Sequence, residues 1–429
     1  MSERQVDQHE KDVIERGRKV LPAGGFGNVT FDVVVAKGQG GHVWDESGNE
    51  YIDYLLGSGP MLVGHAHPVV TAAVMEQVAK GTTFFANNAQ GIALAEDIVD
   101  GVPCADQVRF VSTGSEATFY AMRAARALTG RDKFLKFEGG FHGMSDYALM
   151  SMAPARPGNF PQALPDTAGI PANIADDMLI APYNDAETAT QIIKEYKDEL
   201  AGVIVEPIQR MIPPKPGFLA ALRDATTRAS VPLVFDEVVT GFRFAYGGAQ
   251  EYYGVEPDLC ALGKVIGGGY PLAAVAGRSE IMAVFDGARA KPGHAVKQVG
   301  TLSGNPVAAA AGIATLAVLR EEGAYERIFK TGRALMQGLK DALAKHSVEA
   351  QVLGEPPMFD VVFKSGDITD YRGTLGADAA NLAKFNRELL ARGVLKGDNK
   401  FYVSLAHTEA DVEITLAAYD GALAAVAAS

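Results

Sequence analysis

The sequence predicts an α/β fold with a mostly parallel sheet that helices cover on both faces. Short apolar runs, rich in β-branched and aromatic residues, recur through the middle of the chain without polar alternation, as in strands buried on both faces. Helical stretches lie between successive runs, which is the pattern of βαβ units. The 429 residues are 48% hydrophobic and include 47 glycines, which allows a large core with many tight turns.

The elements of this sheet follow one another in chain order. The predicted strands are 108–112, 133–137, 178–182, 201–207 and 231–237. The predicted helices between them are 116–129, 185–196 and 218–230. Because ligands of parallel sheets bind beyond the carboxyl ends of the strands, polar residues at these ends are the first candidates for a site.

The two ends of the chain predict a second, smaller domain. The elements expected before the sheet are a polar helix over 6–19, a β-hairpin over 42–55 with its turn at Gly48-Asn49, and a helix over 68–80. From Pro306 onward the chain is rich in helices, with short strands near 358–363 and 401–405 and a last helix from Thr408. We therefore predict an N-terminal segment 1–65 that joins the small domain, a large domain 66–305 and a small α/β domain 306–429.

The charge balance narrows the classes of partner. Lys plus Arg number 39 against 52 for Asp plus Glu, a net charge of −13, so nucleic-acid and anionic-membrane binding are not expected. The longest apolar run, 306–319, is too short to cross a bilayer. The charged segment 1–19 is unlike a leader peptide, and Cys104 and Cys260 are too few for a disulfide framework or a zinc site. We expect a cytoplasmic protein.

The first polar signal is Ser112-Thr113-Gly114-Ser115-Glu116, where the strand 108–112 ends and a helix begins. Small residues at a helix start let backbone N–H groups converge on an anion such as phosphate. The alternative is an ordinary capping box with Ser or Thr before Glu116.

The second signal is Asp236-Glu237 at the end of the strand 231–237. A carboxylate at the tip of a buried strand needs a partner, which could be a metal, a protonated ring nitrogen or an arginine. The alternative is a structural salt bridge or helix cap.

The third signal is Lys264, the one charged residue within 259–277. A lysine among apolar and glycine neighbours is desolvated, which makes its amine a usable nucleophile for imine formation. A phosphate cradle, a strand-end aspartate and a buried lysine in this order match the three requirements of pyridoxal 5′-phosphate.

These residues lie within motifs that resemble the class III pyridoxal-phosphate-dependent aminotransferases of fold type I, and among them most closely the glutamate-1-semialdehyde aminomutases. The similar stretches span about 41–413 and are HVWDESGNEYIDY, GHAHP, VRFVSTGSEATFYAMRAARALTGRDKFLKFEGGFHG, VIVEP, PPKPGFL, VFDEVVTGFR, PDLCALGKVIGGGYPLAAVAG, GTLSGNP and SLAHTEADVE. The resemblance implies a large domain with a mostly parallel seven-stranded-type sheet and a smaller α/β domain from both termini.

The resemblance also implies roles for individual residues. Lys264 would bind the cofactor as an imine and then move the proton. Asp236 would keep the ring nitrogen protonated, and Gly114 and Ser115 would bind the phosphate.

Further roles follow from the same resemblance. Phe141 and Val238 would pack on the two faces of the ring, and Glu206 would be a polar gate or an acid close to the ring. Thr301 would reach the phosphate of a neighbouring subunit's cofactor, which implies a homodimer with shared active sites.

The histidines are weaker candidates for a functional site than the residues above. His65 and His67 form a pair without a carboxylate or cysteine cluster, so we expect them to structure a loop and expect no metal. His142 is expected behind the cofactor rather than as a base, because Lys264 already fills that need.

Three segments differ from the aminomutases. Thr30 lies near the place of their carboxylate-clamping arginine, the loop 208–212 after VIVEP is shorter than theirs, and KGDNKFYVSL replaces a loop with serine and glutamate. We therefore expect a ping-pong transaminase that moves an amino group from an amine or amino acid, including β- or ω-amino compounds, to a keto acid or aldehyde. Arg210 and Arg243 are candidates for binding the acceptor carboxylate. The alternative is glutamate-1-semialdehyde 2,1-aminomutase activity.

Overall fold

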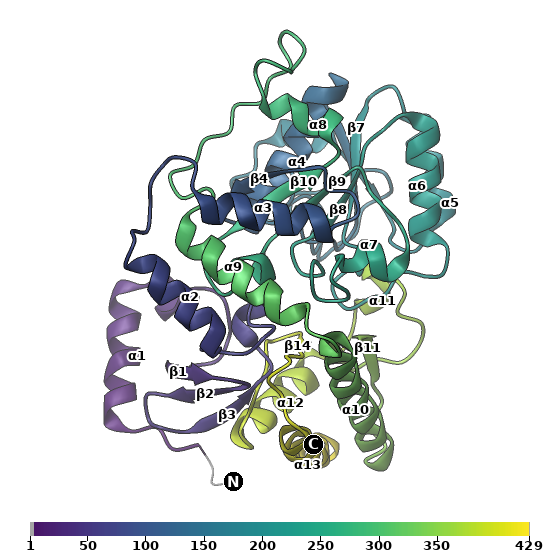
Figure 1. Cartoon of the computed structure of the whole chain (residues 1–429). Helices are drawn as coiled ribbons and strands as arrows, with labels where there is room; N and C mark the ends of the chain where they lie inside the picture. The colour runs from purple at the N-terminus through teal and green to yellow at the C-terminus, as the bar shows by residue number, and fades with distance from the viewer. Residues whose placement is uncertain (1–3, 429) are drawn as a thin grey trace. The chain divides into compact units, whose positions relative to one another are not determined.

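The computed structural model describes residues 4–428, and its chain contacts form two compact units (Figure 1). Unit 2 comprises Val69–Glu321 and Asp367–Leu375. Unit 1 runs up to Pro68 and takes in Glu322–Gly366 and the chain from Gly376 onward. Unit 2 extends to Glu321 and therefore contains helix α9 (Pro306–Leu319). The sequence predicts a C-terminal domain that begins at residue 306 and so includes this helix. The domain limits themselves stay a prediction.

Unit 2 is built on a seven-stranded sheet of order β4-β10-β9-β8-β7-β5-β6. Its strands are β4 (Gln107–Val111), β5 (Lys133–Phe137), β6 (Met178–Ala181), β7 (Leu200–Val205), β8 (Leu233–Glu237), β9 (Leu259–Leu262) and β10 (Ala273–Gly277). Only β10 runs antiparallel to its neighbours, so the predicted mostly parallel sheet is confirmed. The strands β9 and β10, which flank Lys264, were not predicted.

Helices cover this sheet, with α3 and α9 in front of it and α4 behind it in Figure 1. The helices and short turns of unit 2 are α2 (Pro68–Val78), α3 (Ala89–Gly101), α4 (Gly114–Thr129), η3 (Ala172–Asp177), α5 (Ala186–Glu195), α6 (Phe218–Ala229), α7 (Gly248–Tyr253), η4 (Lys264–Gly267), α8 (Ser279–Met282), η5 (Ala283–Phe285), α9 (Pro306–Leu319) and α11 (Tyr371–Thr374). The side chains of β7, β8 and β9 are buried along their whole length, which explains their apolar runs.

Helix α9 is buried on nearly all sides and packs directly against η4, the turn that begins with Lys264. A Cβ added to Gly312 would lie only 2.1 Å from the carbonyl oxygen of Ile266. The glycine therefore sets how closely η4 can approach α9.

We expect Gly312→Ala to lower the stability of the protein by about 1–3 kcal/mol, because the added methyl group overlaps a backbone oxygen in a packed core. This cost opposes the gain of about 1 kcal/mol that alanine brings to a helix interior. The measurement is the thermal unfolding midpoint against Gly287→Ala, whose added Cβ meets open space. Equal midpoints for the two variants would contradict this packing.

Unit 1 contains two small sheets, of order β1-β2-β3-β13 and β11-β12-β14. Its strands are β1 (Val35–Gln39), β2 (His42–Asp45), β3 (Glu50–Asp53), β11 (Gln351–Glu355), β12 (Met358–Val362), β13 (Val394–Leu395) and β14 (Phe401–Tyr402). Its helices and short turns are α1 (Gln8–Val20), η1 (Pro22–Gly24), η2 (Leu56–Ser58), α10 (Ala324–Lys345), α12 (Ala379–Ala391) and α13 (Glu409–Ala427). The predicted hairpin is present as β2 and β3, with Gly48 at φ 83° in its turn.

His407 lies fully inside unit 1 as a neutral ring. The backbone N–H of Ser404 donates to Nδ1 at 3.1 Å, and Nε2 lies 3.1 Å from the carbonyl oxygen of Asp53. Burial lowers the pKa of His407 to about 4. A ring with hydrogen on Nε2 alone satisfies both contacts.

This histidine predicts a loss of stability in acid. Because the pKa in the folded protein is below the unfolded value of about 6.5, the unfolded chain takes up the proton first as the pH falls. The contribution is complete above pH 6.5 and falls by about 2 kcal/mol between pH 6.5 and pH 5. Urea midpoints of the wild type and His407→Gln measured across this range check the prediction. The same pH dependence in both proteins would contradict it.

Candidate active site

The side chain of Val238 lies where three elements of unit 2 meet. A Cβ added to Gly114 would lie 2.8 Å from Cγ1 of Val238, and one added to Gly263 would lie 3.2 Å from the same atom. Gly114 is the first residue of α4, and Gly263 immediately precedes Lys264. The packing therefore brings the start of α4, the end of β8 and the Lys264 turn together at the carboxyl edge of the sheet.

Asp236 is oriented by two hydrogen bonds near the end of β8. Its Oδ1 accepts from the backbone N–H of Val238 at 3.1 Å, and its Oδ2 lies 2.8 Å from Nδ1 of His142. Both side chains are buried. An ionised carboxylate only accepts hydrogen bonds, so this contact requires a hydrogen on Nδ1 of His142.

The start of α4 combines the capping box with free helix donors. Thr113 and Glu116 cap each other, with Oε2 of Glu116 accepting from the backbone N–H of Ser112 and Thr113 at 2.9 Å. The N–H groups of Gly114 and Ser115 belong to the first turn, where a helix has no acceptor of its own to offer. The two interpretations of this segment are therefore compatible, since the cap leaves these donors available for an anion.

A loop after β5 lies against this helix start. Oγ of Ser115 accepts from the backbone N–H of Met144 at 3.2 Å, and a Cβ on Gly143 would lie 2.6 Å from the same Oγ. Thr118 on α4 donates to the carbonyl oxygen of His142 at 2.6 Å. The glycine and the threonine thus fix the loop that carries Phe141 and His142.

Phe141 is held from the end of β7. Its backbone N–H donates to Oε2 of Glu206 at 2.9 Å, and the guanidinium of Arg210 lies 5.0 Å from the centre of its ring. Glu206 itself is buried. The carboxylate of Glu206 and the guanidinium of Arg210, both from the segment after β7, therefore both contact Phe141.

Two cationic residues of the site have strained backbones. Lys264 has φ 48° and Arg210 has φ 59°, the left-handed region that residues with a Cβ rarely adopt. Each such position costs about 1–3 kcal/mol and persists where the surrounding packing imposes it. The Lys264 side chain is half-buried, and the residues that follow it in η4 are buried.

A buried lysine on β5, Lys136, contacts the chain that follows the Phe141 loop. Nζ of Lys136 donates to the carbonyl oxygens of Ala148 and Met150 at 2.7 Å each. Burial lowers the pKa of Lys136 to about 7, against the opposing charges of Asp166 and Glu206. Because Nζ donates to two backbone oxygens of this stretch, we interpret Lys136 as a support for the loop 148–150.

A short segment from the C-terminal part of the chain adds a second support. Arg372 contacts both carboxylate oxygens of buried Glu138, with Nε at 2.6 Å and Nη2 at 3.1 Å, and donates to the carbonyl oxygen of Gly158. Tyr371 covers Gly139, where an added Cβ would lie 2.6 Å from the tyrosine Cβ. These contacts hold the start of the Phe141 loop.

The structure links eight of the ten predicted site residues through these contacts. They are Gly114, Ser115, Phe141, Glu206, Arg210, Asp236, Val238 and Lys264. Thr301 lies exposed in the loop before α9. Arg243 is completely buried and donates through Nε to the carbonyl oxygen of Val239, and its contact with a substrate carboxylate stays a prediction.

Sequence reasoning missed Gln209, which donates through Nε2 to the carbonyl oxygen of Glu138 at 2.8 Å. The sequence feature that could have indicated Gln209 is its polar side chain, three positions after Glu206 at the end of a strand. His142 was expected behind the cofactor, and its contact with Asp236 agrees with that expectation.

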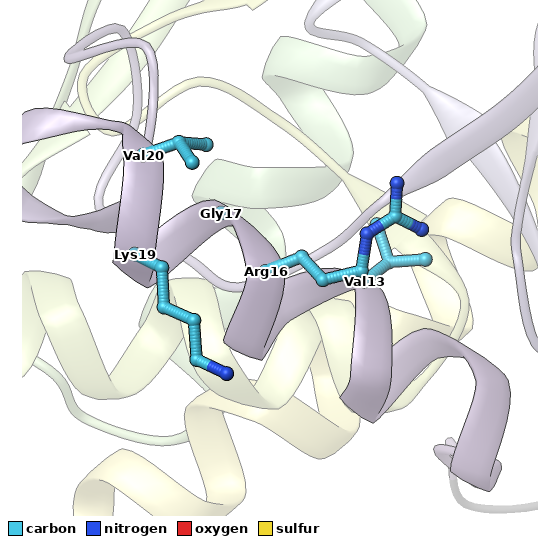
Figure 2. A pocket seen from close by; sticks show the side chains of 5 residues that line it. All are labelled: Val13, Arg16, Gly17, Lys19 and Val20. Atoms are coloured by element: carbon cyan, nitrogen blue, oxygen red, sulfur yellow. The ribbon is translucent and has the colours of Figure 1, made fainter.

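A shallow hollow on one side of α1 is lined by Val13, Arg16, Gly17, Lys19 and Val20 and includes no predicted site residue (Figure 2). His65 pairs with Asp53 at 2.7 Å, and within residues 4–428 no three His, Cys, Asp or Glu side chains gather as metal ligands. No helix in the same range is long and apolar enough to span a membrane.

The donor set fits pyridoxal 5′-phosphate. The α4 start offers N–H donors for a phosphate, Asp236 offers an oriented carboxylate for a ring nitrogen, and Lys264 offers a primary amine.

The chain matches the family model Aminotransferase class-III over residues 25–415. The glutamate-1-semialdehyde 2,1-aminomutase of Natranaerobius thermophilus is 40% identical over 413 residues, which cover 95% of this chain and 94% of that protein. An ω-transaminase structure from Sphaerobacter thermophilus has a TM-score of 0.93 at 34% identity and covers 98% of both chains. A transaminase structure with PLP bound has a TM-score of 0.91 at 30% identity and covers 99% of both chains.

These similarities extend over nearly the whole chain and confirm the predicted family, fold class and cofactor. The chain therefore belongs to the class III aminotransferases, enzymes of the α/β fold type I that use pyridoxal 5′-phosphate.

Proposed function

We propose that the contact set around Val238 is the catalytic centre and that the enzyme transfers an amino group between two molecules. The donor is an amine or amino acid, including β- or ω-amino compounds, and the acceptor is a keto acid or aldehyde. The observation that carries this proposal is the meeting of Lys264, Asp236 and the α4 start at one edge of the sheet.

Each residue has a distinct task in this proposal. The cofactor, when bound, supplies an electron sink for the charge that develops on the substrate carbon. Lys264 holds the cofactor covalently and later moves a proton with its Nζ amine. Asp236 keeps a proton on the ring nitrogen, and Gly114 and Ser115 hold the phosphate against the overall charge of −13.

The flanking residues would orient the cofactor ring and the substrate. Phe141 and Val238 would pack on opposite faces of the ring. Glu206 and Arg210 are the proposed substrate-facing charges, because they lie beside Phe141 and a guanidinium can bind a carboxylate with two hydrogen bonds.

We further propose a homodimer in which Thr301 of one copy reaches the phosphate site of the other. Large apolar side chains are exposed on unit 2, and Phe85, Met75 and Val299 are 71%, 69% and 65% exposed. Monomeric proteins seldom leave such side chains uncovered in number. A cytoplasmic location remains part of the proposal, as do small-molecule partners in place of nucleic acid or membrane.

A second candidate is glutamate-1-semialdehyde 2,1-aminomutase activity, in which the amino group moves within one molecule. The names of the curated relatives support this candidate better than the first. The first candidate is supported by Thr30, which lies near the place of the aminomutases' arginine and donates to Oδ1 of Asp398 at 2.8 Å. A hydroxyl group bonded to a carboxylate cannot replace a bidentate guanidinium.

The deciding experiment mixes the holoenzyme with a panel of amines, amino acids and glutamate 1-semialdehyde, one at a time, and follows the visible cofactor spectrum. For the transaminase we expect an amine to convert the cofactor to its amine form and a separate keto acid or aldehyde to restore it. Turnover of glutamate 1-semialdehyde without any external acceptor would overturn the transaminase and establish the second candidate. No spectral response to any amine would overturn both.

A further inference from the structure

One stretch of the C-terminal part of the chain, Asp367–Leu375, belongs to unit 2, although the chain on both sides of it belongs to unit 1. We call this stretch the strap. Its neighbours in the chain are Gly366 and Gly376, with φ 83° and 77°, a backbone conformation that favours glycine. The strap contains the short helix α11 and is bounded at each end by a glycine that lets the chain change direction.

Two side-chain hydrogen bonds fasten the strap to other segments of unit 2. Nδ2 of Asn184 donates to the carbonyl oxygen of Thr369 at 2.9 Å, and the hydroxyl group of Tyr371 donates to the carbonyl oxygen of Pro154 at 3.0 Å. These bonds reach the chain after β6 and the chain after β5. They hold the strap next to Arg372, the residue that follows Tyr371.

Arg372 joins the strap to the chain that leaves β5. Its Nε and Nη2 contact the two carboxylate oxygens of Glu138 at 2.6 Å and 3.1 Å, and Nη2 also donates to the carbonyl oxygen of Gly158 at 2.6 Å. The guanidinium lies 4.2 Å from the centre of the Phe160 ring. The side chain of Glu138 is only 4% exposed, so its carboxylate requires a partner. A planar guanidinium fork fixes the orientation of this carboxylate as well as balancing its charge.

Only two glycines separate Glu138 from Phe141. Gly139 has φ 86°, and a Cβ on it would lie 2.6 Å from Cβ of Tyr371, so the strap covers this residue directly. Gly139 and Gly140 carry no side chain that could anchor the loop, and glycine has more backbone freedom than any other residue. The side chain of Glu138 is therefore the side-chain anchor that precedes Phe141 in this loop.

Other hydrogen bonds hold the same stretch and remain when Arg372 is replaced. The backbone N–H of Gly139 donates to the carbonyl oxygen of Ser151 at 2.9 Å, and that of Phe141 donates to Oε2 of Glu206 at 2.9 Å. Replacement of Arg372 is therefore expected to shift the loop rather than to unfold it. Such a shift would move the Phe141 ring, because the carboxylate that precedes it loses its oriented partner.

We propose that Arg372 is a positioning residue for the cofactor ring, which acts through Glu138 and sets the place of the Phe141 ring against the cofactor. The proposal rests on the proposed function, because Phe141 packs on a cofactor ring only if the cofactor occupies the candidate site. The contacts of Arg372 described above are to Glu138, Gly158 and Phe160, and none of these is a predicted site residue. A misplacement of reacting groups by about 1 Å can slow a reaction by about 10²-fold, so a support outside the site can control the rate.

The first test compares purified holoenzyme of the wild type and Arg372→Gln. We expect the circular dichroism of the visible band, per bound pyridoxal 5′-phosphate, to change in amplitude, because the ring takes another orientation in its asymmetric surroundings. We expect the single-turnover rate with the fastest-reacting amine of the panel described above to fall by a factor on the order of 10–10².

The matched control is Arg223→Gln, which breaks another ion pair of unit 2, between Arg223 and Asp258 at 2.8 Å. We expect both variants to have a lower thermal unfolding midpoint than the wild type. Only Arg372→Gln is expected to change the circular dichroism and the rate, since a merely structural ion pair would affect the midpoint alone.

Two further variants separate orientation from charge and from folding. The double variant Glu138→Gln and Arg372→Gln leaves no unpaired buried charge, so we expect its unfolding midpoint to return toward that of the wild type while the rate stays low. Arg372→Lys keeps the positive charge but lacks the planar fork, so we expect it to recover only part of the rate. If Arg372→Gln does not fold, the double variant carries the same test.

Unchanged circular dichroism and rate in Arg372→Gln, or an equal loss in Arg223→Gln, would overturn the proposal. Full recovery of the rate in the double variant would show that only the unpaired charge mattered and would also overturn it. If the wild type forms no visible band with pyridoxal 5′-phosphate, the proposed function fails and this proposal fails with it. A normal band in the wild type with no change in the variants overturns the role of Arg372 alone.

Discussion

Lys264→Ala is expected to abolish the visible band of the lysine-bound cofactor and to lower turnover by a factor on the order of 10⁴–10⁶. The substitution removes both the amine that holds the cofactor and the group that moves the proton. Lys264 occupies a left-handed backbone position beside Gly263, and a Cβ-bearing residue already stands there, so alanine adds no new backbone conflict. Absorption spectra after addition of pyridoxal 5′-phosphate and steady-state rates measure the two effects.

The control is Lys291→Ala, which removes an exposed lysine of the same unit. We expect it to keep the visible band and the rate. A Lys264→Ala protein that retains the band would show that another amine holds the cofactor and would overturn the assignment.

Asp236→Asn has the second largest expected effect, a loss of turnover on the order of 10²–10³-fold with the cofactor still bound. The amide has the shape of the carboxylate but no charge, so it cannot stabilise a protonated ring nitrogen. It also turns an acceptor of His142 into a group that can donate, which disturbs the 2.8 Å contact. Single-turnover rates and the cofactor content of the purified variant separate slow chemistry from weak binding.

Asp258→Asn serves as a matched control, because Asp258 is a buried aspartate of unit 2 that pairs with Arg223 and accepts from the backbone N–H of Leu233. We expect this control to lower stability and leave the rate per bound cofactor near that of the wild type. An Asp236→Asn enzyme with wild-type turnover would exclude the ring-nitrogen role.

Most elements of the sheet could be predicted because their signals are local. The apolar runs at 133–137 and 178–182 match β5 and β6, and the capping residues at 113 and 408 mark the starts of α4 and α13. The strands β9 and β10 escaped prediction because glycines and a lysine interrupt the apolar pattern between them. Their edges are defined by pairing with β8 and β4, which a periodicity cannot reveal.

The candidate site could be predicted in part, for a related reason. Residues at strand ends are recognisable because parallel strands share an edge, and this predicted Asp236 and the segment at Gly114, whereas Glu206 was predicted from the family resemblance. The predicted role of Arg243 stays a prediction, and the fold shows only that this side chain is completely buried and donates to the carbonyl oxygen of Val239. Burial depends on the surrounding packing, which one sequence does not display.

The sequence by itself determined the family and the cofactor and predicted the catalytic lysine, because these depend on short motifs whose chemistry is carried by adjacent residues. Only the tertiary structure decided that Val238 packs against both Gly114 and Gly263, and that His142 contacts Asp236 from 94 positions away. Such contacts arise when distant segments pack to close van der Waals distance, and no local pattern encodes which side chains then meet.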